Sequence, residues 1–146
     1  MNNTNEMMLE FDAKSENESF ARVAVAGFIA QLNPNMEEMA DIKTAVSEAV
    51  TNSIIHGYQE QEGKIKVKCR LEDKTVFLEV TDQGCGMEDV EKAMEPMYTT
   101  KPDLERSGMG FAFMEAFMDE VKVISSLSEG TTVKMKRTIK SSETDS

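Results

Sequence analysis

Cysteine, histidine and long apolar segments are scarce in this sequence. Its 146 residues include two cysteines, one histidine and no tryptophan. Cys69 and Cys85 are too few for a disulfide scaffold and too differently placed for a zinc site. No apolar run approaches the roughly 20 residues that cross a bilayer, and residues 1–5 are polar rather than a secretory signal. We therefore expect a cytoplasmic protein that does not enter a membrane.

Positive charge is also scarce, because 16 lysines and arginines face 27 aspartates and glutamates, a formal net charge of −11. A nucleic-acid-binding domain would need a basic face, so direct binding to nucleic acid is not expected. Acidic patches could meet a basic protein partner, but net charge alone does not establish one. The length suits one domain with a real core. We place this domain at residues 1–140 and expect a disordered polar tail at residues 141–146.

The hydrophobic pattern predicts elements in the order β-α-α-β-β-(α)-loop-α-β-β. Ser15 and Glu18 have the spacing of a capping box and open the first predicted helix. The predicted elements are a strand at 7–13, helices at 15–32 and 36–56, a hairpin of strands at 64–72 and 75–81, a short helix at 88–94, a loop at 96–110, a helix at 111–120 and a final hairpin of strands at 121–126 and 131–138. This order predicts an α/β (α+β) two-layer sandwich, with helices on one face of a mixed, mostly antiparallel sheet.

The second predicted helix carries an acid and an amide four residues apart, Glu48 and Asn52. At about 100° per residue they share one stripe, roughly a quarter-turn from a small, mostly apolar stripe that suits packing on a sheet. That second stripe consists of Ile42, Val46, Ala49 and Ser53. The amide oxygen can ligate a hard cation such as Mg²⁺, and the carboxylate can orient or deprotonate a nucleophile. Taken alone, such a pair is more often a solvated pair on an amphipathic helix, but the glycine-containing segments below favour a chemical role.

Two glycine-containing segments each suggest part of a nucleotide site. Asp82, Gly84 and Gly86 follow a predicted strand, where the glycines let the backbone turn tightly and approach a flat ligand. The Asp82 carboxylate can accept a hydrogen bond from an exocyclic amine such as that of adenine. Gly108 and Gly110 precede a predicted helix, whose first N–H groups can bind phosphates. Either segment alone is common loop chemistry.

Two cations, Lys101 and Arg106, lie in the predicted loop before the second glycine pair. They are either solvated loop charges or a cationic lid over a γ-phosphate. No Walker A sequence occurs, and no Gly-x-Gly-x-x-Gly follows a first strand. The common phosphate-binding motifs are therefore not the basis of a nucleotide site in this chain.

The order of these segments resembles the Bergerat-type ATP-binding fold shared by gyrase and the histidine kinases. Its four parts are Glu-x-x-x-Asn on a helix, Asp-x-Gly-x-Gly, Gly-x-Gly, and Gly-Thr-Thr at residues 130–132 entering a terminal strand. Residues 17–23, 47–58 and 99–111 further resemble the sporulation anti-sigma factors, which are serine protein kinases of endospore-forming bacteria. This similarity runs from about residue 7 to residue 136 and is specific to that family.

The resemblance implies a role for each position. Glu48 corresponds to the catalytic base, Asn52 to the Mg²⁺ ligand, and Arg22 to an arginine that engages protein partners. The implied nucleotide-binding residues are Asp82, Gly84, Gly86 and Thr132 around adenine, and Thr99, Lys101, Arg106, Gly108 and Gly110 in a lid over the phosphates. ATP and Mg²⁺ are the implied cofactors. The implied partners are a sporulation sigma factor, an anti-anti-sigma protein phosphorylated on serine, and a second copy of the chain in a homodimer.

Three functions fit these residues. The first is a serine kinase that also sequesters a sigma factor, and the second is a binding module that uses ATP only to set its conformation. The third is the ATPase or histidine-kinase module of something larger. We expect no second domain in this length to couple hydrolysis to movement, and His56 lies in the nucleotide helix, so the third is disfavoured. Glu48 separates the first two, because a pure nucleotide sensor needs no base.

Overall fold

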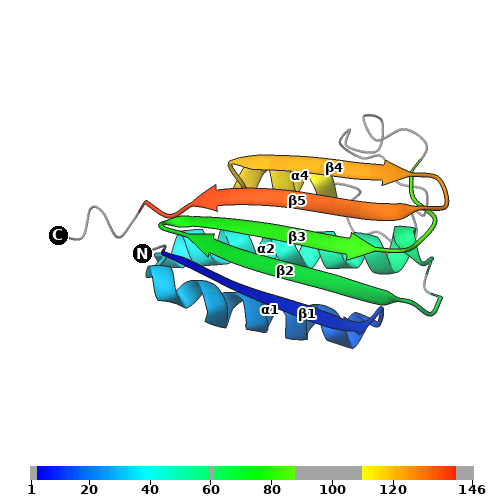
Figure 1. The fold of residues 1–146 in the computed structure, drawn as a ribbon, viewed down its shortest axis with the longest axis horizontal. Coiled ribbons are helices and arrows are strands. Elements are labelled where there is room, and N and C mark those ends of the chain that lie inside the picture. The colour runs from blue at the N-terminus through cyan, green and yellow to red at the C-terminus, as the bar shows by residue number, and fades with distance from the viewer. Residues whose placement is uncertain (1–2, 60, 88–109, 141–146) are drawn as a thin grey trace.

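The chain folds into a five-stranded sheet with helices on one face (Figure 1). The computed structural model describes residues 3–59, 61–87 and 110–140. The strands are β1 (Thr4–Asp12), β2 (Lys64–Glu72), β3 (Thr75–Asp82), β4 (Glu120–Ser126) and β5 (Gly130–Thr138), in the order β1-β2-β3-β5-β4. Each neighbouring pair of these described strands is antiparallel. The predicted two-layer fold class is confirmed, and the sheet is more uniform than the mixed one expected.

The helices α1 (Ser15–Ile29), α2 (Met36–Asn52) and α4 (Gly110–Phe117) form the second layer. α2 is central, because it packs against α1 on one side and α4 on the other. Its predicted small and apolar stripe is buried, as the helical period requires, and comprises Ile42, Val46, Ala49 and Ser53. Every second residue of β3 faces the helices and completes the core, namely Val76, Leu78 and Val80. None of the helices in the described ranges is long and apolar enough to span a bilayer.

The start of α1 differs from the prediction. Lys14 occupies the N-cap position without a side-chain hydrogen bond, so Ser15 and Glu18 do not form the expected capping box. The Glu18 carboxylate instead accepts a hydrogen bond from Ser47 of α2, because burial against the neighbouring helix offers it a donor there. At its other end α1 stops at Ile29 and continues as a short 3₁₀ turn, Ala30–Leu32.

The end of α4 also differs from the prediction. α4 ends at Phe117, before the predicted residue 120, because the chain already enters β4 at Glu120. The predicted short helix at 88–94, nearly all of the loop at 96–110 and the tail at 141–146 lie outside the described residues.

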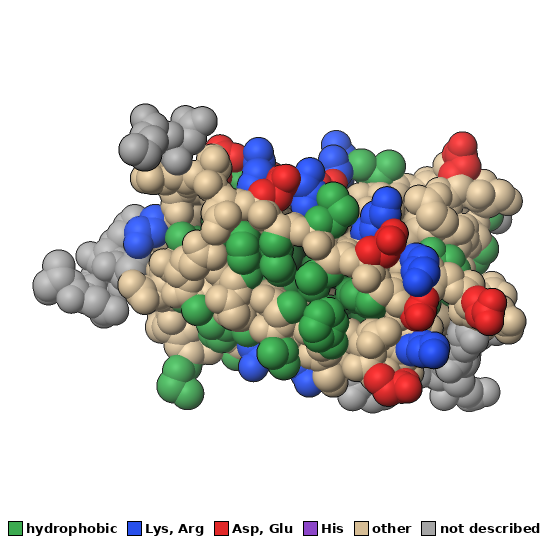
Figure 2. All heavy atoms as spheres, turned by 60° about the horizontal axis from the view of Figure 1, so that its bottom comes forward, with side chains coloured by type: hydrophobic (Ala, Val, Ile, Leu, Met, Phe, Trp, Pro, Cys, Tyr) green, Lys and Arg blue, Asp and Glu red, His purple; other side chains and the backbone are tan. Residues whose placement is uncertain are grey.

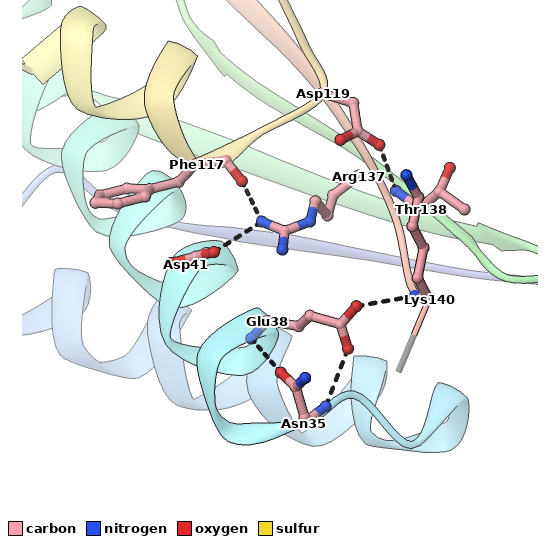
Figure 3. A network of polar contacts seen from close by, with 8 residues as sticks. All are labelled: Asn35, Glu38, Asp41, Phe117, Asp119, Arg137, Thr138 and Lys140. Carbon is pink, nitrogen blue, oxygen red and sulfur yellow. Dashed lines mark hydrogen bonds and ion pairs between the residues drawn. The ribbon is translucent and has the colours of Figure 1, made fainter. Parts of the chain in front are cut away.

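A capping box forms at the start of α2 and also connects this helix to the chain just after β5 (Figure 3). The Asn35 side chain accepts from the Glu38 N–H at 2.7 Å, and Glu38 Oε1 accepts from the Asn35 N–H at 3.0 Å. The second oxygen, Glu38 Oε2, accepts from the Lys140 N–H at 2.8 Å. Glu38 is 6% exposed, so its two oxygens satisfy backbone donors that have little access to water.

Arg137 of β5 connects this strand to both α2 and α4. Its guanidinium donates to Asp41 of α2 at 2.9 Å and to the carbonyl of Phe117, the last residue of α4. Asp119, just after α4, accepts from the Thr138 N–H of β5 at 2.8 Å. α2, α4 and β5 are therefore held together around the first turns of α2.

Glu38→Gln tests the importance of this connection for stability. The amide keeps one acceptor oxygen but replaces the other with an NH₂ group, which cannot accept a hydrogen bond from a backbone N–H. Leaving such a buried donor unsatisfied costs about 1–3 kcal/mol. We expect the free energy of unfolding, measured by urea denaturation, to fall by that amount. Glu37→Gln is the matched control, because Glu37 is exposed in the same helical turn and carries the same charge. Equal stability of the two variants would contradict the role of Glu38.

Candidate functional site

The last turns of α2 carry Glu48 and Asn52, and both side chains are half-buried beside the apolar stripe. The helix was predicted to continue regularly to residue 56. Instead it widens into a π-helical turn, η2 (Ser53–Gly57), in which the Tyr58 N–H donates to the Ser53 carbonyl at 2.9 Å. Single π turns inside helices are frequent at functional sites. This one directly follows the predicted metal ligand.

Asp82, the last residue of β3, contacts this turn and is 2% exposed. Its Oδ2 accepts a hydrogen bond from the Ser53 hydroxyl at 2.8 Å, and its Oδ1 accepts from the Gly84 N–H at 2.9 Å. The backbone of Thr131, the residue opposite Asp82 on β5, also favours the carboxylate. A carboxylate offers about four lone-pair positions, so acceptor capacity is left for a ligand amine. The Ser53 bond also brings the Asp82 box and the helix of Glu48 and Asn52 into one site.

The loop after β3 lies directly against η2. The Cys85 N–H donates to the Gly57 carbonyl at 2.8 Å. Gly84 is needed for this approach, because a Cβ atom there would lie 2.2 Å from the same Gly57 oxygen. Gly86 has a φ of +73°, and its Cβ would lie 2.0 Å from the Ser126 carbonyl oxygen. Both predicted glycines therefore allow backbone contacts that a larger residue would prevent.

β5 presents Thr131, rather than the predicted Thr132, to this site. In the register of the two strands, Asp82 pairs with Thr131 and Thr81 pairs with Thr132. Since successive residues of a strand face opposite sides, Thr131 is buried on the Asp82 side of the sheet. The Thr132 hydroxyl lies 3.1 Å from that of Thr81 on the other side. The position beside the base edge is therefore corrected to Thr131, which only the strand register could identify.

Burial raises the pKa of Asp82, while the hydrogen bonds from Gly84, Ser53 and Thr131 act in the opposite direction. A raised pKa means that folding favours the protonated carboxyl group. Its contribution to stability is present below the unfolded pKa of about 3.8 and is lost as the pH rises through the folded value. Above that range the buried carboxylate costs stability, as expected of a residue that serves a ligand rather than the fold.

Asn52 has the property expected of a ligand-binding side chain. Its amide nitrogen is buried and has no hydrogen-bond partner within residues 3–59, 61–87 and 110–140, although buried polar atoms in proteins are nearly always paired. A phosphate oxygen would satisfy this nitrogen, and a half-turn of the amide would direct its oxygen to a cation. Magnesium typically takes one or two protein ligands and completes its shell with water and phosphate oxygens. The residues present therefore fit a magnesium nucleotide.

The predicted lid is only partly described. Gly110 is the first residue of α4, and α4 packs against α2, so the predicted phosphate-binding helix start belongs to the same layer as Glu48. Thr99, Lys101, Arg106 and Gly108 lie outside the described residues. Their roles stay predictions.

Arg22 lies on α1, near the side of this helix that contacts α2. Its Nη1 is 3.6 Å from Glu18 Oε2, and its side chain is 39% exposed. Figure 2 brings the α1 and β1 edge of Figure 1 forward and shows hydrophobic side chains gathered on the face turned to the viewer. Phe20 and Val23 of α1 are exposed, and Phe20 packs edge-on against Phe11 on the β1 side of the helix. Arg22 and Glu18 lie instead on the side of α1 that faces Ser47 of α2. A partly exposed arginine at such a junction suits a protein contact.

A model of the histidine kinase-like ATPase domain family matches residues 11–137. The chain therefore belongs to this class of ATPase domains. A crystal structure of the RsbU and RsbW domains of a Mycobacterium tuberculosis protein has the same fold, with a TM-score of 0.67 and 22% sequence identity. The match covers 92% of this chain and 32% of that one.

Sequence relatives define the family more narrowly. An anti-sigma F factor of Clostridium novyi (strain NT) is 59% identical over 140 residues, which cover 95% of this chain and 98% of the relative. The anti-sigma F factor of Bacillus subtilis (strain 168) is 56% identical over 140 residues, covering 95% and 96%. The chain belongs to the anti-sigma F factor family.

Asp82→Asn tests the adenine side of the site. Because a hydrogen bond to a charged acceptor contributes about 1.5–3 kcal/mol, we expect ADP affinity, measured by calorimetric titration, to fall roughly 10- to 150-fold. Stability should change in the opposite sense: relative to the wild type, the variant should become more stable as the pH rises above about 3.8. Glu79→Gln is the control, on the same strand but the opposite face. Unchanged ADP affinity in Asp82→Asn would remove this carboxylate from the site.

Proposed function

We propose that this protein binds and inhibits a sporulation sigma factor, and is an ATP-dependent serine kinase that phosphorylates and inactivates an anti-anti-sigma protein. The observation that supports the kinase activity is the 2.8 Å hydrogen bond from Ser53 to Asp82, which joins the helix of Glu48 and Asn52 to this buried carboxylate. Membership of the anti-sigma F factor family supports the sigma-factor partner.

In the proposed reaction Glu48 is the general base. Asp82 accepts a hydrogen bond from the adenine amine, with Thr131 beside the base edge, and Asn52 is the protein ligand of Mg²⁺. The bound cation supplies charge stabilisation to the phosphates. Glu48 takes the proton of the substrate serine while the serine oxygen bonds to the γ-phosphorus and the bond to the β–γ bridging oxygen breaks, which releases ADP.

The remaining parts of the proposal concern the lid, the assembly and the location. Lys101 and Arg106 would neutralise charge on the γ-phosphate, and Thr99, Gly108 and Gly110 would complete the cover over the phosphates. The protein would act as a homodimer in the cytoplasm. Incubation with labelled ATP, Mg²⁺ and the anti-anti-sigma protein tests the reaction, and label on a serine of that protein is the expected result.

Glu48→Gln separates catalysis from binding. The amide keeps the shape of the side chain but cannot take a proton, and loss of a general base typically lowers the rate about 10²- to 10⁴-fold. We expect phosphotransfer to fall in that range while ADP and sigma-factor affinities stay within a few-fold. Glu37→Gln, an exposed acid at the far end of the same helix, is the control. Phosphotransfer near the wild-type rate would make Glu48 structural, and no transfer by the wild type would favour an ATP-switched binding module.

Arg22→Ala tests the partner surface. Arginine pairs with carboxylates through a planar fork and is a frequent interface hot spot, where truncation costs about 2 kcal/mol or more. We expect sigma-factor and anti-anti-sigma affinities to fall about 30-fold or more, with ADP affinity unchanged. The matched control is Arg70→Ala, an exposed arginine of β2 on the open face of the sheet. A variant that holds both partners normally, or that also loses ADP, would exclude this role for Arg22.

A further inference from the structure

Glu18 joins α1 to α2 through a buried carboxylate. Its Oε1 accepts a hydrogen bond of 2.5 Å from the hydroxyl of Ser47. Ser47 is buried on α2, immediately before Glu48. The Glu18 side chain is 16% exposed, and its Oε2 is buried with no hydrogen-bond partner among the residues that the structure describes. One oxygen is therefore anchored, while the other lacks the donor that a buried carboxylate ordinarily has.

Arg22 is the cation beside this second oxygen. Its Nη1 lies 3.6 Å from Glu18 Oε2, which is an ion pair without hydrogen-bond contact. An acid four residues before a base is the favourable orientation for such a pair on a helix. The carboxylate is held on a buried serine, whereas Arg22 is 39% exposed. The Glu18 carboxylate therefore has the more fixed position of the two groups, and it restrains the orientation of the Arg22 side chain.

We propose that Glu18 is a positioning residue for partner docking: anchored on Ser47, it holds Arg22 in the orientation in which a carboxylate of an incoming protein can pair with it. This inference rests on the partner-binding role proposed for Arg22. Ordering a long side chain on binding costs affinity, and a side chain that is already restrained avoids part of that cost. Because Ser47 lies on α2, a partner that docks on Arg22 also has a defined position relative to Glu48 and Asn52 of the same helix.

A mutant cycle on Glu18 and Arg22 tests the proposal, with sigma-factor affinity as the first readout. Glu18→Gln keeps an oxygen for Ser47 but removes the charge that holds Arg22. We expect affinity to fall about 2- to 10-fold, the cost of ordering one flexible side chain. In the Arg22→Ala background, Glu18→Gln should have no further effect. Glu16→Gln, an exposed acid in the first turn of α1, is the matched control.

Phosphotransfer kinetics distinguish positioning from a structural role. A residue that only orients the partner contact should raise the KM for the anti-anti-sigma protein and leave kcat and ADP affinity unchanged. Ser47→Ala, which keeps the ion pair but frees Glu18 from α2, should give a smaller change of the same kind. That change should also disappear in the Arg22→Ala background. The folding of each variant is checked by its ADP affinity.

Three results would overturn the proposal. Additive losses in the double variant Glu18→Gln/Arg22→Ala would mean that Glu18 acts independently of Arg22. A lower kcat or weaker ADP binding in Glu18→Gln would assign it to the structure of the catalytic helix instead. Failure of the proposed kinase activity can be told apart from failure of this inference. A wild type without phosphotransfer still allows the Glu18 and Arg22 mutant cycle to be measured by sigma-factor affinity. Normal partner binding by Arg22→Ala excludes both the docking role of Arg22 and this inference.

Discussion

The hydrogen bond between Ser53 and Asp82 is the contact on which the candidate site depends. Asp82 ends β3, and Ser53 begins the π turn after α2, so this bond fixes the helix layer to the sheet where ligand chemistry is expected. A carboxylate with almost no access to water must be satisfied within the protein, which explains the convergence of donors from Ser53 and Gly84. The burial that raises the Asp82 pKa also makes each of its hydrogen bonds stronger than it would be in water.

α2 is fixed at both ends and functional between them. At its start, Glu38 and Arg137 connect it to β5 and to the end of α4. At its other end the π turn bonds to Asp82 and to the loop that follows. Glu48 and Asn52 are half-buried on the last turns of this helix. A catalytic group is useful only if its support holds it within a fraction of an ångström, and a buried helix tied at each end provides that support.

The surface around Arg22 also depends on a contact between two elements, in this case α1 and α2. Glu18 has the right spacing to cap α1, yet the carboxylate turns to Ser47 of α2, and α1 begins without a side-chain cap. A lost cap typically costs about 1 kcal/mol. Departures from a local rule of this kind tend to fall at functional positions. Here the departure places an acid beside Arg22 where α1 contacts α2.

Local pattern was enough to predict the layers, most strands, the buried stripe of α2 and the shared face of Glu48 and Asn52, because helical and strand periods are properties of neighbouring residues. The glycines at 84 and 86 were also recognisable, although the carbonyl groups that exclude a side chain there come from distant segments. Tertiary structure alone decided between Thr131 and Thr132, because a shift of one residue in strand register exchanges the two faces of a sheet. It likewise decided that Glu38 caps a helix and Glu18 does not. Both acids have the spacing of a cap, and only the packing of α1 against α2 placed a buried serine within reach of Glu18.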